Sequence, residues 1–397
     1  MNDEVLRMEK QDSDRRPRLL IVTTVATTLA SILRSQPKFL AQYYDVHLAC
    51  SHGNAFATVA ANEGVPVHPI PMVRGINPLA DVVSVLRMIL LIWKLKPDAV
   101  HSYTPKAGLV AMLASRLCFV PLRIHTFTGL IFPTARGKRR KVLMWVDRLI
   151  CYCASHIIPE SNGVRRDLKE GKITRKPLQI IGHGNVAGID VERFCVSHDD
   201  VANGAAELRN KLEIQDSDFL FAFVGRLNKD KGINELLAAF SVLPLNARLV
   251  LVGALDSSQP ISESALAEIK TSRRITWIGP QADVRPALQL ADVLVLPSYR
   301  EGFPNVVLEA GAMQLPVIAT DINGSNEAIT EEFNGWLVPV QDVDLLAHAM
   351  LRAMKAPQLQ LREMGKRARA RVVERFERKS HLVRLRAYYN SILTVKD

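Results

Sequence analysis

The sequence predicts an α/β protein made of two doubly wound domains, each built around a parallel sheet. Short apolar runs of strand length alternate with helical stretches along almost the whole chain, a pattern typical of parallel sheets with helices on both faces. A length of 397 residues is too great for one ordinary core. A glycine-rich segment without periodicity, GHGNVAGIDVERF at 182–194, interrupts the alternation near the middle and is expected to link the domains.

The first series of elements follows a polar stretch, residues 1–17, that is expected to be a disordered lead-in. Its expected strands are apolar runs bounded by turn residues: RLLIVTT (18–24), DVHLACS (45–51), VPVHPI (65–70), DAVHSY (98–103), RIHTFT (123–128) and SHIIPES (155–161), with LQIIG (178–182) closing the series. Helices are expected at about 28–43, 55–63 and 77–97, the last ending at a proline. Residues 18–190 therefore form the predicted N-terminal domain.

The second series starts at Phe219 and supplies the predicted C-terminal domain, residues 191–379. After the strand at Phe219 its expected strands are ARLVLVG (247–253), ITWIG (275–279), DVLVLP (292–297), LPVIAT (315–320) and NGWLVP (334–339). Charge-rich helical segments fill the tail from Asp342 onward.

Two glutamates eight positions apart, Glu301 and Glu309, follow the expected strand ADVLVLP (291–297). Glu301 lies on the loop at the carboxyl end of that strand, and Glu309 lies about one turn inside the next helix, on the same side. Open α/β sheets bind their ligands at this end of the strands. Two carboxylates suit sugar hydroxyls better than phosphate. The alternative for an isolated pair is a capping glutamate and a solvated one.

The segment FLFAFVGRLNKDKGINELLAAF (219–240) predicts a strand, a glycine turn, a basic loop and a helix. Gly225 permits a close backbone approach, and Arg226 and Lys231 flank the turn. Two cations beside a helix N-terminus suit a diphosphate, although a surface salt-bridge loop has the same composition. Together with the two glutamates, these cations indicate a site for a nucleotide-sugar donor.

The segments VGRLNKDKG (224–232) and EGFPNVVLE (301–309) closely resemble the retaining glycosyltransferases of family four, and so does ATDINGSNEAI (319–329). Three N-terminal segments resemble the subgroup that builds bacterial surface glycans and lipid-linked oligosaccharides: HSYTPKAG (101–108), RIHTFTGLIF (123–132) and SNGVRRDL (161–168). The resemblance implies the GT-B fold, with two Rossmann-like domains facing a central cleft. The N-terminal domain would bind the acceptor and the C-terminal one the nucleotide sugar, and the last helix, 380–397, would pack back on the N-terminal domain.

The resemblance also implies roles for single residues of this chain. Arg226 and Lys231 would hold the donor diphosphate and stabilise the leaving group. Glu301 would contact the donor sugar, and Glu309 would bind the ribose hydroxyls. The other implied donor contacts are Gly225, Gly302, Phe303 and Asn305. His125 matches a histidine near the reacting sugar carbon, and it completes an implied catalytic set of Arg226, Lys231, Glu301 and His125.

The implied acceptor contacts lie in the N-terminal half: His101, Lys106, Thr128, Arg165 and Arg166. The cations among them could bind the pyrophosphate of a polyprenyl-diphosphate-linked sugar, or they could be surface cations without a ligand. A histidine at a strand end, such as His101, is otherwise a structural residue. Two positions depart from the family pattern: TTVATTLAS (23–31) lacks the usual glycine, and Gln314 replaces a glycine that usually ends a helix.

The net charge of +11 comes from the N-terminal half. Residues 1–195 hold 27 Lys and Arg against 15 Asp and Glu, whereas residues 196–397 hold 24 against 25. The basic run RGKRRK (136–141) stands beside Val142–Trp145, which suits an anionic membrane surface, with a solvated basic helix as the alternative. No nucleic-acid-binding motif accompanies the charge, so no nucleic acid partner is expected.

No segment is apolar and long enough to span a bilayer. The five cysteines form no regular framework, which predicts buried thiols in a reducing cytoplasm. A cytoplasmic protein lying at the inner face of the plasma membrane is therefore expected. The D-x-D triplets at 12–14, 216–218 and 342–344 lie away from the donor motifs, so no metal site and no cofactor are expected.

These observations predict a retaining, metal-independent glycosyltransferase. It would move a hexose or N-acetylhexosamine from a UDP-sugar to a polyprenyl-diphosphate-linked or nascent surface glycan. The alternatives are a non-catalytic nucleotide-sugar-binding subunit on the same scaffold and a nucleotide-sugar epimerase.

Overall fold

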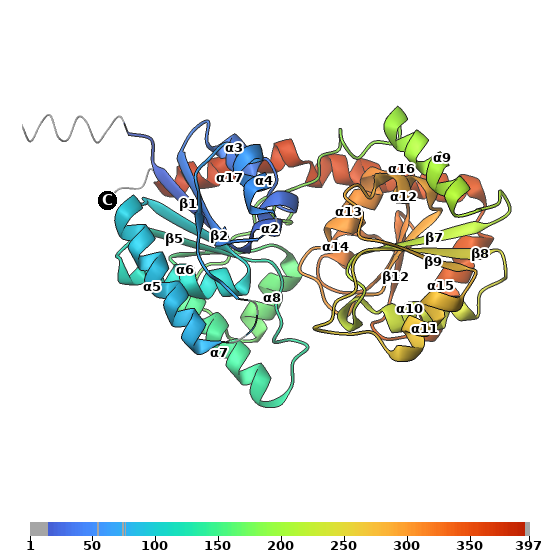
Figure 1. The fold of residues 1–397 in the computed structure, drawn as a ribbon, viewed down its shortest axis with the longest axis horizontal. Coiled ribbons are helices and arrows are strands. Elements are labelled where there is room, and N and C mark those ends of the chain that lie inside the picture. Colours follow the sequence, from blue (N-terminus) through green and yellow to red (C-terminus); the bar gives the residue numbers. More distant parts are fainter. Residues whose placement is uncertain (1–14, 54, 74, 76, 394–397) are drawn as a thin grey trace, which may run out of the picture. The chain divides into compact units, whose positions relative to one another are not determined.

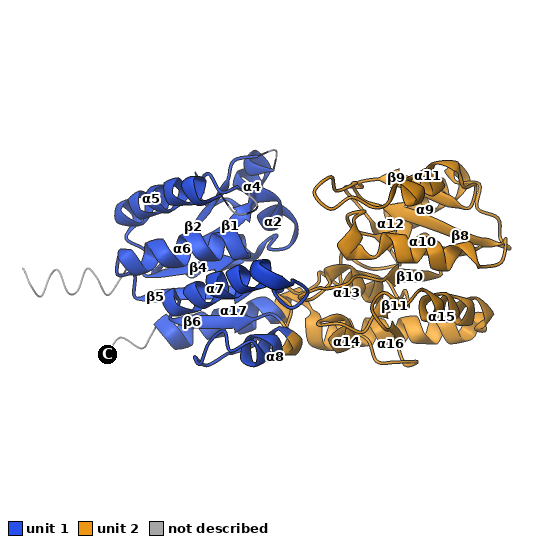
Figure 2. Cartoon of the chain, turned by 90° about the horizontal axis from the view of Figure 1, so that it is seen from below, with its two compact units in different colours: residues 1–160, 164–182, 381–397 blue, residues 161–163, 183–380 orange. Residues whose placement is uncertain are grey.

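The computed structural model describes residues 15–393 apart from 54, 74 and 76 (Figure 1). Most of the expected lead-in, residues 1–14, lies outside the described residues. The chain divides into two compact units (Figure 2). Unit 1 comprises residues 1–160, 164–182 and 381–397, and unit 2 comprises residues 161–163 and 183–380. The division near residue 182 falls inside the glycine-rich segment that was expected to link the domains.

Unit 1 contains a six-stranded parallel sheet in the order β3-β2-β1-β4-β5-β6. Its strands are β1 (Arg18–Val25), β2 (Asp45–Ser51), β3 (Val67–Pro69), β4 (Ala99–Tyr103), β5 (Leu122–Phe127) and β6 (His156–Pro159). The helices are α2 (Ala26–Ser31), α3 (Gln36–Leu40), α4 (Phe56–Glu63), α5 (Pro78–Leu95), α6 (Pro105–Leu117), α7 (Gly137–Cys153), α8 (Asn162–Glu170) and α17 (Arg378–Leu393). α5 packs on α6 and α6 packs on α7, so these three form one helical layer.

Unit 2 repeats this arrangement with a parallel sheet in the order β12-β11-β10-β7-β8-β9. Its strands are β7 (Phe219–Val224), β8 (Ala247–Val252), β9 (Ile275–Gly279), β10 (Val293–Leu296), β11 (Val317–Thr320) and β12 (Gly335–Val338). The helices are α9 (Asp199–Lys211), α10 (Ile233–Ser241), α11 (Glu263–Thr271), α12 (Arg285–Leu290), α13 (Asn305–Ala312), α14 (Ser325–Ala328), α15 (Val343–Lys355) and α16 (Gln358–Phe376), with a 3₁₀ turn at Lys229–Lys231. Counted from its first strand, each sheet follows the order 3-2-1-4-5-6, so the predicted pair of Rossmann-like sheets is confirmed.

The central strands form because their sequences are apolar on both faces. In β7 and β10 the side chains of Phe221, Phe223 and Leu294 are fully buried in one core cluster. Strands covered by helices on both faces need such continuous apolar runs rather than an alternating pattern. These continuous apolar runs made the strand positions predictable from the sequence.

The C-terminal helix α17 belongs to unit 1, although the chain reaches it only after completing unit 2 (Figure 1). Tyr389 is fully buried, and its hydroxyl lies 2.6 Å from Nδ1 of His101 on β4. The Tyr44 hydroxyl donates to Oδ1 of Asn390 at 2.6 Å. α17 therefore supplies part of the interior of unit 1.

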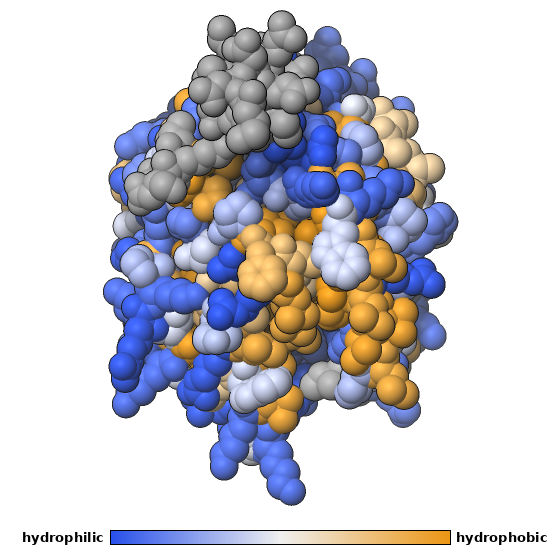
Figure 3. Space-filling model, turned by 90° about the vertical axis from the view of Figure 1, so that its left-hand side faces the viewer, coloured by the Kyte–Doolittle hydropathy of each residue, from blue (hydrophilic) through white to orange (hydrophobic). Residues whose placement is uncertain are grey.

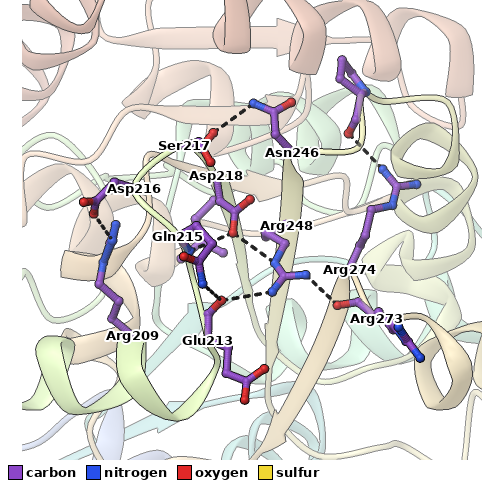
Figure 4. A network of polar contacts seen from close by, with 12 residues as sticks. Arg209, Glu213, Gln215, Asp216, Ser217, Asp218, Asn246, Arg248, Arg273 and Arg274 are labelled. Atoms are coloured by element: carbon purple, nitrogen blue, oxygen red, sulfur yellow. Dashed lines mark hydrogen bonds and ion pairs between the residues drawn. The ribbon is translucent and has the colours of Figure 1, made fainter.

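A polar network closes the amino ends of β7 and β8 (Figure 4). The Arg248 guanidinium donates to the carbonyl of Arg273 at 2.8 Å and lies 3.4 Å from the Asp218 carboxylate. That carboxylate also accepts from the backbone N–H of Gln215 at 2.9 Å. These contacts fix the strand starts and lie at the opposite end of the strands from the loops described below.

Two expected elements differ from the structure. The expected helix at 28–43 is divided into α2 and α3, because Ser35 adopts a left-handed φ of 66° and Pro37 cannot continue the preceding helix. The expected strand LQIIG makes only an isolated bridge between Leu178 and Ile157.

Candidate donor site in unit 2

The strand order of unit 2 brings two predicted loops together. β7 pairs with β10, and the helices that follow these two strands lead to opposite edges of the sheet. The turn after β7 and the loop after β10 therefore meet at the switch point of the sheet, where open α/β sheets bind ligands. The ammonium group of Lys231, on the first loop, forms an ion pair with the Glu301 carboxylate on the second.

The turn after β7 is held by an asparagine and an aspartate. Asn228 is 1% exposed, its side-chain oxygen accepts from the backbone N–H of Lys231 at 3.0 Å, and its amide donates to Asp256 at 3.1 Å. Asp256 also forms an ion pair with Arg226, whose side chain is 59% exposed. Asp256 therefore holds the Arg226 guanidinium, and Asn228 connects Asp256 to the backbone of Lys231. The Lys231 ammonium is held by Glu301.

Gly232 has to be glycine for this turn to reach α10. Its φ is 68°, and a Cβ atom built on it would lie 2.1 Å from the carbonyl oxygen of Pro297 at the end of β10. Any side chain at this position would force apart the turn after β7 and the strand that carries the Glu301 loop.

The loop after Glu301 presents free backbone donors. Within the described part of the chain, the backbone N–H groups of Gly302, Phe303 and Asn305 have no hydrogen-bond acceptor. Asn305 opens α13, so its N–H lies at a helix N-terminus, which attracts anions. The side-chain oxygen of Asn305 accepts from the Asn185 amide at 2.6 Å, which fixes the start of the helix.

Glu309 lies on α13 with a partly buried side chain. Burial raises the pKa of this carboxyl from 4.5 to about 7, although Arg193 and Arg378 act in the opposite direction. No described residue forms a hydrogen bond or ion pair with its carboxylate, and no such contact joins it to Arg226, Lys231 or Glu301. A buried carboxylate without a partner is costly unless a ligand donates hydrogen bonds to it.

Three cations of these two loops are paired with carboxylates in the structure. The pairs are Arg226 with Asp256, Lys231 with Glu301, and Arg300 with Asp230, the last at 2.5 Å. Ser258 donates to Asp256 from both its hydroxyl and its backbone N–H, and with Asn228 and Arg226 it lowers the pKa of Asp256 to about 2. A diphosphate that binds these cations would have to take the place of their carboxylate partners.

In unit 1, the expected catalytic His125 is fully buried on β5. Its Nδ1 lies 2.8 Å from the Ser102 hydroxyl, and its Nε2 has no partner. Burial lowers the pKa of His125 to about 3, so the ring is neutral. A Cβ atom at Gly108 on α6 would lie 2.4 Å from the ring, so this glycine makes room for it. The His125 ring is therefore enclosed by protein, with Ser102 and Gly108 among its neighbours.

The expected acceptor residues His101 and Lys106 both have protein partners. His101 is fully buried, with Nδ1 2.6 Å from the Tyr389 hydroxyl and Nε2 2.7 Å from the Thr126 hydroxyl. This leaves His101 no ring nitrogen for an acceptor, so its placement corrects that expectation to a structural role. The Lys106 ammonium contacts both carboxylate oxygens of Asp81 on α5, at 2.6 and 2.7 Å.

The remaining expected acceptor residues are Thr128, after β5, and Arg165 and Arg166, on α8. Thr128 and Arg165 are partly exposed, and Arg166 is exposed. Glu327, from the predicted motif at 319–329, accepts from the backbone N–H groups of Asn162 and Gly163 at 2.9 and 3.0 Å.

Among the described residues, no group of three or more His, Cys, Asp or Glu side chains could hold a metal ion. Asp342 of the third D-x-D triplet caps α15 by accepting from the N–H of Leu345 at 2.9 Å. Asp216 and Asp218 pair with Arg209 and Arg248 (Figure 4). The triplet at 12–14 lies outside the described residues.

Four residues that shape the donor site were not predicted from the sequence: Asn185, Asn228, Asp230 and Asp256. Asn228 and Asp230 lie inside the quoted segment 224–232, where their side chains could have been considered as partners of the cations. Asn185 and Asp256 lie in segments without a distinctive pattern, and only the folded chain brings them to the site.

Comparisons with known proteins show the family to which the chain belongs. Residues 22–184 match the family model described as "Glycosyl transferase 4-like domain", and residues 205–371 match "Glycosyl transferases group 1". The chain is 31% identical, over 91% of its length and 94% of the relative's, to a protein of Staphylococcus aureus described as a capsular polysaccharide biosynthesis glycosyltransferase, CapM.

An Escherichia coli relative, described as a UDP-Gal:alpha-D-GlcNAc-diphosphoundecaprenol alpha-1,3-galactosyltransferase, is 27% identical over 84% of this chain and 86% of its own. The crystal structure of Anabaena HepE in complex with UDP and glucose matches 94% of this chain and 100% of its own, with a TM-score of 0.79 and 18% identity. The chain therefore belongs to the glycosyltransferases of family four, enzymes with the GT-B fold, in the group that builds bacterial surface glycans.

Proposed function

We propose that this glycosyltransferase moves a hexose or N-acetylhexosamine from a UDP-sugar to a polyprenyl-diphosphate-linked glycan. The observation that carries the proposal is the switch point of the unit 2 sheet, where Arg226 and Lys231 follow β7 and Lys231 pairs with Glu301 of the loop after β10. In that loop, three backbone N–H groups have no acceptor among the described residues. Cations and N–H groups fit a diphosphate, and carboxylates fit sugar hydroxyls. The E. coli relative is named for a UDP-galactose donor and a diphosphoundecaprenol acceptor, which supports both substrate classes.

In this proposal the chemistry is electrostatic. Arg226 and Lys231 stabilise the negative charge that develops on the leaving diphosphate. The acceptor attacks from the same face as the leaving group, and the departing phosphate takes the proton of the acceptor hydroxyl. The anomeric configuration is retained without an enzymic nucleophile. The cations take the part that a divalent metal plays in other enzymes, so the reaction is proposed to be metal-independent.

The acceptor is proposed to be reached at the cytoplasmic face of the membrane. No described helix has the length and apolar character needed to cross a bilayer. All five cysteines are free thiols, which is consistent with a reducing compartment. The excess of basic residues in the N-terminal half supports contact with an anionic membrane surface.

The test is a transfer assay with UDP-hexoses and UDP-N-acetylhexosamines, a polyprenyl-diphosphate sugar as the acceptor, and EDTA present. We expect one donor to give an extended lipid-linked product, with the anomeric configuration of the donor as judged by NMR. A requirement for divalent metal, or an inverted product, would overturn that part of the proposal. An isomerised donor without an acceptor would instead identify an epimerase.

Replacing Asp256 by Asn is expected to strengthen UDP binding about two- to fivefold. The donor diphosphate competes with the Asp256 carboxylate for Arg226, and an exposed ion pair of this kind is worth about 1 kcal/mol or less. Isothermal titration with UDP measures the effect, with Asp230→Asn as a matched control, because Asp230 pairs with Arg300 instead. Weaker binding in D256N would mean that Asp256 positions Arg226 for the diphosphate rather than competing with it.

A further inference from the structure

The outward face of α5 is apolar. Six large side chains on it are between 46% and 83% exposed, and they are Leu79, Val82, Val83, Leu86, Leu90 and Trp93. Their spacing of mostly three or four residues places them along one side of the helix, and we call them the α5 stripe. The inward face, with Met88, Ile92 and Leu95, is buried in the core of unit 1. A surface helix usually carries polar residues outward, so the α5 stripe needs an explanation.

More apolar side chains stand exposed on the same helical layer. Leu117 and Phe119, at the end of α6, are 56% and 89% exposed, and Trp145 and Tyr152 on α7 are 61% and 62% exposed. Figure 3 views this side of the molecule and shows an apolar area bordered by hydrophilic side chains. The stripe is therefore part of a broader apolar surface.

The exposed charges on this helical layer are positive. Helices α5, α6 and α7 contain nine Lys and Arg residues and only two acidic residues, Asp81 and Asp147. Asp81 is paired with Lys106, and Asp147 is 6% exposed, so neither acid offers a charge at the surface. The exposed cations include Arg87 and Lys94 on α5 and the run from Lys138 to Lys141 at the start of α7.

This composition distinguishes between two occupants of the surface. A second copy of the chain would bring the same cations and apolar groups, with no exposed acid on these helices to pair with Arg87 or Lys94. An anionic lipid surface offers both an apolar phase and negative headgroups. Exposed Trp and Tyr side chains are also typical of proteins that rest at the headgroup level.

We propose that the α5 stripe inserts into the interface of an anionic bilayer, with the basic residues at the start of α7 resting on the headgroups. The proposal rests on the proposed function, because an enzyme that uses a lipid-linked acceptor has to work at a membrane. Attraction between basic residues and anionic headgroups would not require any particular helix. This proposal assigns the apolar contact with the bilayer to α5. The helix lies along the membrane surface and does not cross it.

The experiment is sedimentation of the full-length chain with vesicles of phosphatidylglycerol and phosphatidylcholine, and with vesicles of phosphatidylcholine alone. The test variant is Leu86→Gln with Leu90→Gln. The matched control is Val242→Gln with Leu245→Gln, two side chains that are 66% and 86% exposed in unit 2. Thermal unfolding with and without UDP is recorded for each protein, so that folding and donor binding are checked separately from vesicle binding.

We expect the test variant to need at least about tenfold more anionic lipid for half-maximal sedimentation, whereas the control variant behaves as the parent chain. The parent chain should bind phosphatidylcholine vesicles more weakly than the anionic ones. Equal binding by parent and test variant would overturn the proposal. So would a parent dimer that fails to bind vesicles and becomes monomeric in the test variant. A parent chain that binds vesicles but shows no UDP shift would instead contradict the proposed function.

Discussion

Replacing Arg226 by Ala is expected to lower kcat for sugar transfer by about 10² to 10³, because one of the two cations that stabilise the leaving diphosphate is lost. The guanidinium pairs with Asp256, which accepts from the Asn228 amide, and the side-chain oxygen of Asn228 accepts from the backbone N–H of Lys231. A cation that acts mainly on developing charge affects kcat more than the KM for the donor. Initial rates over a range of donor concentrations separate the two parameters.

The fold should tolerate this change. The Arg226 side chain is 59% exposed, and its ion pair with Asp256 contributes little at a surface. Arg226→Lys is the matched control: it keeps the charge but loses the planar fork, so it should recover part of the activity. Unchanged turnover in R226A, with the protein folded, would contradict the role proposed for Arg226.

Replacing Glu309 by Gln is expected to weaken UDP binding by about tenfold or more and to stabilise the folded protein above pH 7. The carboxylate has no partner among the residues that the structure describes, and it is proposed to accept hydrogen bonds from the ribose hydroxyls. A charged acceptor binds these hydroxyls more strongly than an amide does. In the parent chain, UDP affinity should rise with pH through about 7, as the carboxyl ionises. Titrations with UDP between pH 5.5 and 8.5 test this, and E309Q should show a much flatter profile.

The effect of Glu309→Gln on the free energy of unfolding follows from the raised pKa of the Glu309 carboxyl. Below pH 4.5 the carboxyl is protonated in the folded and unfolded chains alike, so it contributes no difference. As the pH rises from 4.5 to about 7, the unfolded chain ionises first, and the folded chain loses stability relative to it. At pH 8 the neutral glutamine avoids this loss, which we put at about 2 kcal/mol, or several degrees in Tm.

Thermal unfolding of parent and E309Q at pH 4 and pH 8 measures this effect. Glu301→Gln is a useful comparison, because its carboxylate is paired with Lys231 and its loss should not stabilise the fold. Equal Tm values for parent and E309Q at both pH values would show that Glu309 is well solvated in the free protein. Stronger UDP binding by E309Q would rule out its proposed contact with the ribose.

Most of the fold was predictable from the sequence, because the central strands are apolar on both faces. β2 has the predicted bounds, and β7 and β10 are runs whose side chains are almost all buried. The division of the expected helix at 28–43 was not predicted, because it depends on a left-handed Ser35 that no propensity favours. LQIIG was expected to be a strand from its composition, but it makes only an isolated bridge between Leu178 and Ile157.

The site was only partly predictable, for a different reason. Parallel strands carry the loops that follow them to one edge of the sheet, so the meeting of Lys231 and Glu301 follows from the predicted topology. The partners of Arg226 and Arg300 depend on how side chains orient after folding, and no spacing in the sequence marks them. Nor does the sequence distinguish a histidine at the mouth of a site from one inside the domain, such as His101.

The place of α17 has a consequence for the order in which the two units can fold. The interior of unit 1 includes Tyr389, which follows residues 183–380 in the chain. Unit 1 therefore cannot complete its core before all of unit 2 has been synthesised.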